Sequence, residues 1–368
     1  MNIEKIIITG DILRPSTDGE SSNQKINIDW LYNLLKYPIG LGVKLPVEIL
    51  NWEGNSNSFN SKLFYKLNGL NSMPEDWIML YKSKKFSNAS LGYLSTFFEN
   101  SLVIGFELPD IIMNMFDELN IPYIDIIIHP IRYLDDIFFG FRTNKKKIFD
   151  QIKKFQIHSN RYYIQAGIHN ATISRMTDLN ITENSVLFTG QVEIDKSLLR
   201  NGDILSVLDF KDEFIKLSKY YNKIYFKKHP YSQGIDEVDS FLKSLNNVEF
   251  IENNFYHLLG QKNIESVYSI SSSTVLESSY FGKNSQFLYQ SPFLFSKNEE
   301  KDFNSQHYIP VYDDFLEPDF WSVIFDKKDA NDFKKIIPSK SNRLRNSIQN
   351  YWGYNFLDSE ILYKYSKG

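Results

Sequence analysis

Residues 185–198 read SVLFTGQVEIDKSL, and this stretch decides how the second half of the chain folds. Its apolar start predicts a buried strand that stops at Gly190. Gln191, Glu193 and Asp195 follow at once, so the strand ends in a polar cluster with two carboxylates two residues apart. Such a cluster either caps the next helix or takes part in chemistry. Alternation along an extended segment would put both carboxylates on the same side, so the spacing does not choose between them.

The same alternation of elements continues downstream of this strand. Amphipathic, helix-length stretches separate short apolar runs, and such runs are typical of a parallel sheet that is buried on both faces. We predict strands over residues 185–191, 223–230, 248–252, 265–271 and 285–290. We predict helices over 212–221, 237–245 and 273–282, the last with Gly282 at its C′ position.

The first half of the chain repeats this pattern with fewer elements. Predicted strands cover 5–10, 101–108, 122–130 and 161–167, and a predicted helix covers 109–120. Two Rossmann-like α/β units in tandem, with a ligand between them, are the simplest architecture for such a chain. We expect a first domain at 1–175, a second at 183–340 and a helical tail at 341–368 that packs back on the domains.

Bulk composition excludes several classes of protein. The chain has 368 residues, a net charge of −4 and no cysteine. The charge gives no electrostatic case for nucleic-acid binding, and the missing cysteine removes disulfides, thiolate metal sites and cysteine nucleophiles. The N-terminus lacks the features of a signal peptide, and no run approaches the roughly 18 apolar residues of a membrane span. We therefore expect a soluble, cytoplasmic protein.

Ligands of open α/β sheets bind at the carboxyl ends of the strands. One predicted strand ends in FKKHP (226–230), which places Lys227, Lys228 and His229 before Pro230. A histidine at this point can donate a hydrogen bond to a phosphate oxygen and favour a departing phosphate. The alternative is a histidine in an ordinary turn, with the proline ending the strand.

A second strand end carries a run of hydroxyl side chains. The predicted strand over 265–271 runs into SSSTVLES (271–278), which begins with Ser271, Ser272, Ser273 and Thr274. Hydroxyls and free backbone N–H groups at a helix start form an anion site, although an ordinary N-cap is the alternative. A His-Pro strand end followed about 40 residues later by such a cluster suits a nucleotide phosphate. The chain has neither a P-loop nor a G-x-G-x-x-G motif.

The first half offers candidates for acid–base chemistry. Glu107, in GFELPD, is expected at a strand end as a general acid or base; the alternative is that it only interacts with the dipole of the next helix. Arg132 or Arg142 could hold a substrate carboxylate, unless the charges between 123 and 144 form an internal salt-bridge network. No group of His, Asp or Glu has the spacing of a metal site, so we predict no catalytic metal.

Three of these stretches resemble a known family. GQVEIDKS (190–197), FKKHP (226–230) and SSSTVLES (271–278) resemble the retaining β-Kdo transferases of bacterial capsule and O-antigen (lipopolysaccharide) assembly. Residues 105–110 and 121–144 are similar to the O-antigen branch of that group. The resemblance implies a GT-B architecture, CMP-β-Kdo as donor, no other cofactor and metal-independent catalysis. The His-Pro and serine motifs are shared with bacterial sialyltransferases, so those two indicate a CMP-sugar without identifying it.

The resemblance also implies a role for each candidate residue. Asp195 would attack the anomeric carbon as nucleophile, and a second displacement would restore the starting configuration. Glu107 would deprotonate the acceptor hydroxyl, with Asp125 as its rival. The first domain would bind the acceptor and the second the donor. The donor would be held by Gln191, Lys227, Lys228, His229, Pro230, Ser271, Ser272, Ser273 and Thr274.

The expected partners are a CMP-sugar and a glycan or lipid-linked glycan acceptor, with action at the cytoplasmic face of the inner membrane. Three alternatives stay open. A sialyltransferase or another nonulosonate transferase would invert configuration, use a carboxylate only as base and form no sugar adduct at Asp195. A CDP-glycerol-type polyol phosphotransferase would use the same two phosphate motifs. A degenerate binding domain would have no activity.

Overall fold

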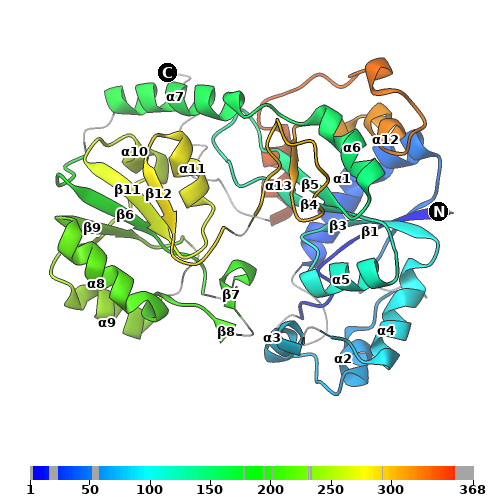
Figure 1. Cartoon of the computed structure of the whole chain (residues 1–368), viewed down its shortest axis with the longest axis horizontal. Helices are drawn as coiled ribbons and strands as arrows, with labels where there is room; N and C mark the ends of the chain where they lie inside the picture. The colour runs from blue at the N-terminus through cyan, green and yellow to red at the C-terminus, as the bar shows by residue number, and fades with distance from the viewer. Residues whose placement is uncertain are drawn as a thin grey trace. The chain divides into compact units, whose positions relative to one another are not determined.

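The computed structural model of the chain (Figure 1) shows two compact units. It describes residues 3–15, 24–51, 58–83, 85–176, 179–193, 195–200, 203–230, 232, 234–291 and 293–352. Among these, the first unit comprises 3–129, 136–157 and 294–352, and the second comprises 130–135 and 158–291 with 293. Each unit has its own sheet and its own helices, as the alternating pattern of the sequence predicts.

The first unit is built on a six-stranded mixed sheet with the order β13-β5-β4-β3-β1-β2. Strands β1 to β4 are parallel, whereas β5 pairs antiparallel with both β4 and β13. In the register of β1 and β3, Gly10 pairs with Phe106, so the carboxyl ends of these strands lie side by side. The strands are β1 (Lys5–Gly10), β2 (Val47–Ile49), β3 (Ser101–Phe106), β4 (Tyr123–Ile128), β5 (Phe139–Thr143) and β13 (Ile309–Val311).

Alternate side chains of this sheet enter different hydrophobic layers. Ile6, Ile104 and Ile126 belong to the core that α1, α6, α12 and α13 cover. On the opposite face, Phe116 of α5 packs on Tyr123, with ring centroids 5.9 Å apart. Between β2 and β3 the chain forms α2, α3 and α4, which lie together in Figure 1. The helices are α1 (Lys25–Val43), α2 (Ser61–Leu67), α3 (Pro74–Ser83), α4 (Asn88–Ser95), α5 (Asp110–Glu118), α6 (Lys146–Ile152), α12 (Pro318–Ile324) and α13 (Arg343–Trp352).

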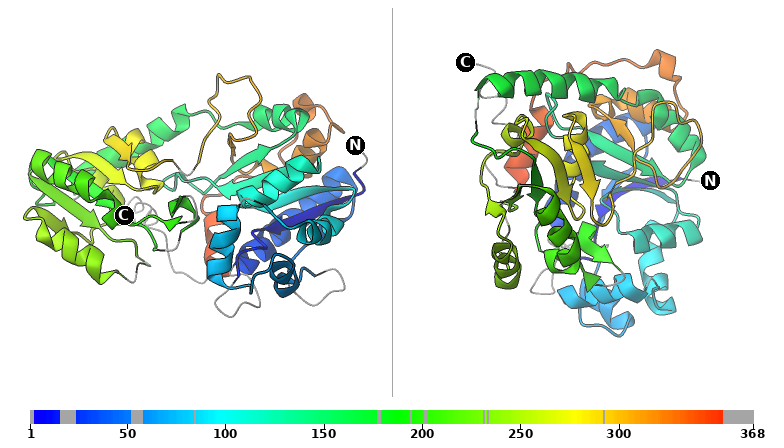
Figure 2. Two further views of the ribbon diagram at one scale, coloured as in Figure 1. Left: turned by 60° about the horizontal axis from the view of Figure 1, so that its bottom comes forward. Right: turned by 60° about the vertical axis from the view of Figure 1, so that its left-hand side comes forward.

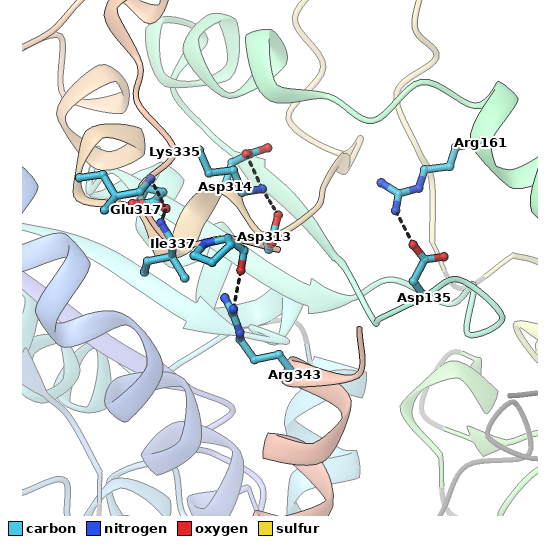
Figure 3. A network of polar contacts seen from close by, with 10 residues as sticks. Asp135, Arg161, Asp313, Asp314, Glu317, Lys335, Ile337 and Arg343 are labelled. Carbon is cyan, nitrogen blue, oxygen red and sulfur yellow. Dashed lines mark hydrogen bonds and ion pairs between the residues drawn. The ribbon is translucent and has the colours of Figure 1, made fainter. Parts of the chain in front are cut away.

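The chain returns to the first unit at residue 294, so the second domain predicted at 183–340 is too long. β13 joins this segment to β5 of the first sheet, and the Tyr308 hydroxyl donates to Asp125 of β4. Within the segment (Figure 3), Lys335 pairs with Asp313 and Asp314, and Glu317 accepts the backbone N–H groups of Ile336 and Ile337. No local sequence motif predicts that this segment packs in the first unit. Of the predicted tail, α13 packs in the first unit, and residues 353–368 lie outside the described residues.

The second unit is built on a five-stranded, fully parallel sheet with the order β10-β9-β6-β11-β12. Its first strand is central, the next two lie on one side and the last two on the other, which is the strand order of a Rossmann-like sheet. The strands are β6 (Ser185–Thr189), β9 (Lys223–Lys227), β10 (Val248–Phe250), β11 (Ile264–Ser269) and β12 (Asn284–Phe287), beside a short hairpin of β7 (Leu199–Arg200) and β8 (Asp203–Ile204).

Helices cover both faces of this sheet (Figure 2). Phe214 of α8 and Leu242 of α9 pack against Phe188 and Phe226 of the strands on one face. On the other face α10 and α11 contact α7. The helices are α7 (Asn160–Met176), α8 (Lys211–Tyr220), α9 (Asp236–Ser244), α10 (Phe255–Leu259) and α11 (Thr274–Tyr280). Gly282 has a φ of 77°, which confirms the predicted left-handed residue after the last of them.

The strand predicted over 161–167 is wrong, because this stretch is part of α7. Tyr162, Ala166, His169 and Ile173 are buried at spacings of three and four, which is a helical period. The short window favoured a strand because it holds two tyrosines and an isoleucine, residues with high strand propensity. The first sheet also differs from the expectation of parallel strands, since β5 and its partner β13 add an antiparallel edge.

Candidate functional site

The candidate site lies at the carboxyl edge of the second sheet. Strand order reverses there between β6 and β11, and ligands of open α/β sheets bind at such a switch point. The turn after β6 carries Gln191, the segment after β11 carries Ser271 to Thr274, and His229 follows the neighbouring β9. The structure therefore brings the three predicted motifs of this half to one edge of one sheet.

Gln191 spans the switch point. Its Oε1 accepts the backbone N–H of Ser271 at 2.8 Å, and its Nε2 donates to Ser197 Oγ at 2.9 Å. One amide side chain thus connects the start of the serine segment to the turn that follows β6. This explains why a residue with both a donor and an acceptor stands directly after the strand.

The hydroxyls of the serine segment have different environments. Thr274 Oγ1 lies 2.6 Å from Thr189 Oγ1 and 3.0 Å from Ser272 Oγ, so these three groups bind one another. Ser273 makes no side-chain cap to α11. Ser271 is only 1% exposed, and its Oγ has no hydrogen-bond partner among the described residues. Leaving a buried hydroxyl unpaired costs about 1–3 kcal/mol, so Ser271 is the member of the segment that calls for an explanation.

A pocket of about 570 Å³, counted with its open mouth, lies at the ends of β6 and β9. His229 and Lys228 line it, and Lys228 Nζ is 2.5 Å from Asp239 Oδ2 on α9. Aromatic and aliphatic side chains form most of its wall, as expected of a small-molecule site. The lining includes Phe188, Gln191, Glu193, Val207, Phe226, Lys228, His229, Ile235, Asp239 and Ile270.

Several predicted donor-binding residues do not line this pocket. Lys227 instead donates to the backbone oxygen of Glu252 at 3.4 Å, and Pro230 is exposed to solvent. The serine segment borders the switch point and is connected to the pocket through Gln191. The pocket thus assembles His229, Lys228 and Gln191 from the predicted set.

The two carboxylates of the turn after β6 have different surroundings. Glu193 lines the pocket, and its Oε1 accepts the Ser232 hydroxyl and the backbone N–H of Gly234, the latter at 3.2 Å. Asp195 is the N-cap of a short 3₁₀ turn and accepts the backbone N–H of Ser197 at 2.8 Å. It does not line the pocket. The contacts of Asp195 are therefore those of the capping interpretation, and its role as nucleophile stays a prediction.

The hydrogen bonds of Glu193 were not predicted from the sequence. Glu193 joins the turn after β6 to the loop that follows the His-Pro pair, and Ser232 in turn donates its backbone N–H to His229 O at 2.9 Å. Because Glu193 and Ser232 are about 40 positions apart, no local sequence pattern predicts their hydrogen bond. The parallel pairing of β6 with β9, which puts their carboxyl ends together, is the signal from which it could have been inferred.

In the first unit, Glu107 follows β3 in a left-handed conformation, with φ 52°. A non-glycine residue in this region carries about 1–3 kcal/mol of strain, and such residues cluster at functional sites. Its backbone N–H donates to Ile126 O at 3.0 Å, and its side chain is half-buried. Because β1 and β3 are neighbours, Glu107 lies beside Asp11 at the carboxyl edge of the first sheet.

Asp125, the rival of Glu107, has a structural environment. It is fully buried and accepts hydrogen bonds from Leu108 N at 2.8 Å, Arg142 Nε at 2.8 Å and Tyr308 Oη at 2.6 Å. Burial lowers the pKa of Arg142, and the Asp125 carboxylate more than offsets this, so the pKa of Arg142 lies above its ordinary value. Arg142 thus belongs to an internal ion pair, which is the alternative that the sequence left open.

The charges that surround Arg142 in the sequence are also used internally. Asp135 pairs with Arg161 at 3.3 Å (Figure 3), and Asp136 accepts the backbone N–H groups of Leu344 and Arg345 at the start of α13. Burial raises the pKa of Asp136 although these hydrogen bonds favour its charged form. Arg132 donates its backbone N–H to Glu277 Oε1 at 2.6 Å.

The described residues contain neither a metal-ligand cluster nor a membrane-spanning helix. No three histidine, aspartate or glutamate side chains in this part of the chain are grouped as a metal site would require. None of its helices combines the length and the apolar composition that crossing a membrane demands.

Comparison with known proteins identifies the family. A model of the alpha-2,8-polysialyltransferase (POLYST) family matches residues 59–290. No curated protein matches the chain. Among solved structures, the β-Kdo 2,7-transferase of Thermosulfurimonas dismutans KpsC is similar at 11% identity and a TM-score of 0.34, over 65% of this chain and 81% of that one. The β-Kdo 2,4-transferase of the same KpsC is similar at 17% identity and a TM-score of 0.32, over 50% and 68%. Likeness at these TM-scores does not establish a shared fold.

The family match spans well over half of the chain and contains Glu107, the turn after β6, the His-Pro pair and the serine segment. We conclude that the chain belongs to the alpha-2,8-polysialyltransferase family and is a glycosyltransferase that acts on a CMP-linked nonulosonate sugar.

Proposed function

We propose that this protein transfers sialic acid from CMP-sialic acid to a hydroxyl of a sialylated glycan, with inversion at the anomeric carbon. The observation that carries the proposal is the position of Gln191, which binds the backbone N–H of Ser271 at the switch point and lines one pocket with His229, within the region that matches the family. A phosphate is the ligand that such an edge suits best, because backbone and side-chain donors converge on it there.

In this proposal the second unit binds the donor and the first binds the acceptor, as in a GT-B enzyme. His229 donates a hydrogen bond to the CMP phosphate and stabilises its charge as it leaves. The unpaired hydroxyl of Ser271 supports a ligand contact at the same edge. The apolar pocket walls at Val207 and Ile235 suit the face of a pyrimidine ring. No metal is assigned a role.

The reaction we propose is a single displacement. The acceptor oxygen forms a bond to the anomeric carbon while the bond from that carbon to the CMP phosphate breaks, and the hydroxyl proton passes to Glu107. The phosphate of CMP-sialic acid is β-linked, so one inversion yields the α linkage named in the family description. Asp195 accepts a hydrogen bond from the backbone N–H of Ser197 as a cap. This supports a single displacement, which requires no carboxylate nucleophile.

A second candidate is retaining β-Kdo transfer from CMP-β-Kdo through an Asp195 adduct, in capsule or O-antigen assembly. One observation favours it: residues 190–195 read GQVEID, the element that resembles β-Kdo transferases. Attachment at the inner membrane, where a lipid-linked acceptor would be extended, is part of both proposals.

A donor screen separates the candidates. The purified protein is incubated with CMP-sialic acid, CMP-Kdo or CDP-glycerol and a sialylated oligosaccharide, and the product is followed by mass spectrometry and early-time NMR. We expect turnover of CMP-sialic acid with an α product, and a large loss of CMP affinity in His229→Asn. His158→Asn, at an exposed histidine of the same unit, is the control. Turnover of CMP-Kdo alone, with a sugar mass on the peptide that contains residue 195, would establish the second candidate instead.

A further inference from the structure

Two aromatic residues of α3 keep buried polar atoms without a partner. Trp77 Nε1 and Tyr81 Oη are shielded from solvent and make no hydrogen bond within the described residues. The Trp77 side chain is only 3% exposed. Each buried donor left unpaired costs about 1–3 kcal/mol, so two such donors one turn apart on a helix require an explanation. A ligand that accepts hydrogen bonds accounts for both atoms.

The two rings form one cluster with an arginine from the end of β1. Trp77 and Tyr81 are one helical turn apart, with ring centroids 4.8 Å apart and an interplanar angle of 65°. The Arg14 guanidinium carbon lies 5.1 Å from the centroid of the Trp77 ring, which is cation–π geometry. An indole N–H, a phenol O–H and a guanidinium are thereby gathered at one place.

This cluster lies near the candidate base. Arg14 follows β1 closely, and the pairing of Gly10 with Phe106 puts the end of β1 next to the end of β3, after which Glu107 stands. Burial raises the pKa of Tyr81 well above its ordinary value, and the charges of Asp11 and Asp110 raise it further. The Tyr81 hydroxyl therefore keeps its proton at neutral pH and can act as a donor.

We propose that Arg14, Trp77 and Tyr81 form a subsite for an anionic sugar residue of the acceptor. The three groups supply donors, which suits the carboxylate and ring oxygens of a sialic acid unit. The aromatic rings offer a surface to the apolar face of the sugar. The inference rests on the proposed function for the identity of the sugar.

The test measures acceptor binding without any donor. An α2,8-linked sialic acid tetramer is titrated into the full-length protein by calorimetry. Tyr81→Phe removes only the hydroxyl and Trp77→Phe removes the indole N–H, while Tyr37→Phe, at a tyrosine of α1 that is 69% exposed, is the control. We expect each of the first two changes to weaken tetramer binding by about five- to tenfold, with CMP binding and the control unchanged.

Other outcomes have distinct meanings. Wild-type affinity in Tyr81→Phe and Trp77→Phe, with a raised melting temperature, would mean that the orphaned atoms are only a structural cost and would overturn the subsite. Failure of the wild-type protein to bind the tetramer would overturn it as well. Weakened tetramer binding in a protein that does not turn over CMP-sialic acid would leave the subsite standing and refute the proposed donor.

Discussion

Replacing Asp195 with asparagine separates the two interpretations of the carboxylate after β6. As a cap, Asp195 accepts one backbone N–H at 2.8 Å, and asparagine can accept the same bond. Asparagine and aspartate cap helices about equally well, so Asp195→Asn should change the free energy of unfolding by no more than a few tenths of a kcal/mol. Asp195→Ala removes the acceptor and should cost about 0.5–2 kcal/mol.

The same two variants have a very different effect if Asp195 is a nucleophile. Neither asparagine nor alanine can form the sugar ester, and loss of a covalent route typically lowers kcat by about a thousandfold or more, which corresponds to roughly 4 kcal/mol of activation free energy. The two interpretations therefore differ in kcat by orders of magnitude, whereas the stability of the asparagine variant is nearly the same under both.

The assay is initial-rate release of CMP from the donor, measured beside a thermal melt and CMP titration. We expect Asp195→Asn to keep kcat within about threefold, and Asp195→Ala to lower the melting temperature by about 2–4 °C for each kcal/mol lost. Asp209→Asn is a matched control, because Asp209 also binds a backbone N–H, that of Ser206 at 2.7 Å, in the capping box of the same unit. A thousandfold loss of kcat in Asp195→Asn alone, with stability and CMP affinity intact, would refute the capping interpretation.

Three further predictions concern the same unit. Glu193→Gln weakens two hydrogen bonds to the loop after the His-Pro pair, so the KM for the donor should rise several-fold with a smaller change in kcat; an unchanged KM would contradict this positioning role. Ser271→Ala should weaken CMP binding about fivefold yet keep or raise the melting temperature, since it removes an unpaired buried hydroxyl; lost stability with unchanged affinity would argue for a structural hydroxyl. Burial lowers the pKa of Lys283 from 10.5 to about 8, so between those values the unfolded chain binds more protons and stability should rise with pH. Lys283→Met should remove that rise in a pH series of thermal melts, and an identical slope in both proteins would count against it.

The central strands of both sheets could be predicted from the sequence because their residues are apolar on both faces, whereas β2, β5 and β13 of the first sheet were not predicted. Runs such as 185–189 and 123–128 are fully buried, and such runs differ clearly from amphipathic helices. Prediction of these strands also located their carboxyl ends, where His229 and Gln191 were expected. Helix α7 could not be predicted in the same way, since its buried positions become visible only over a window longer than the seven residues first considered.

Features that depend on contacts between residues far apart in the sequence could not be predicted. The return of the chain to the first unit at residue 294 depends on Tyr308, whose hydroxyl reaches Asp125 from 183 positions away, and on contacts such as that of Leu344 N with Asp136. Neither partner has a sequence signature of its own. The difference between Glu193 and Asp195 is of the same kind, because both are acidic, near in sequence and half-buried, and only the loop around Ser232 distinguishes them.

The phosphate motifs predicted the class of donor but not the sugar, and chemistry explains why. Kdo and sialic acid are both keto-acid sugars whose anomeric carbon bears a carboxylate and a CMP phosphate, so an enzyme for either must bind the same leaving group. In our proposal His229, Gln191 and Ser271 bind that shared half of the donor, so they would serve both reactions equally well. Retention differs from inversion by one carboxylate free to reach the anomeric carbon. Because Asp195 binds Ser197 N through Oδ1, retention would require this side chain to reach the anomeric carbon through Oδ2 while it caps the turn, whereas inversion requires nothing of this carboxylate.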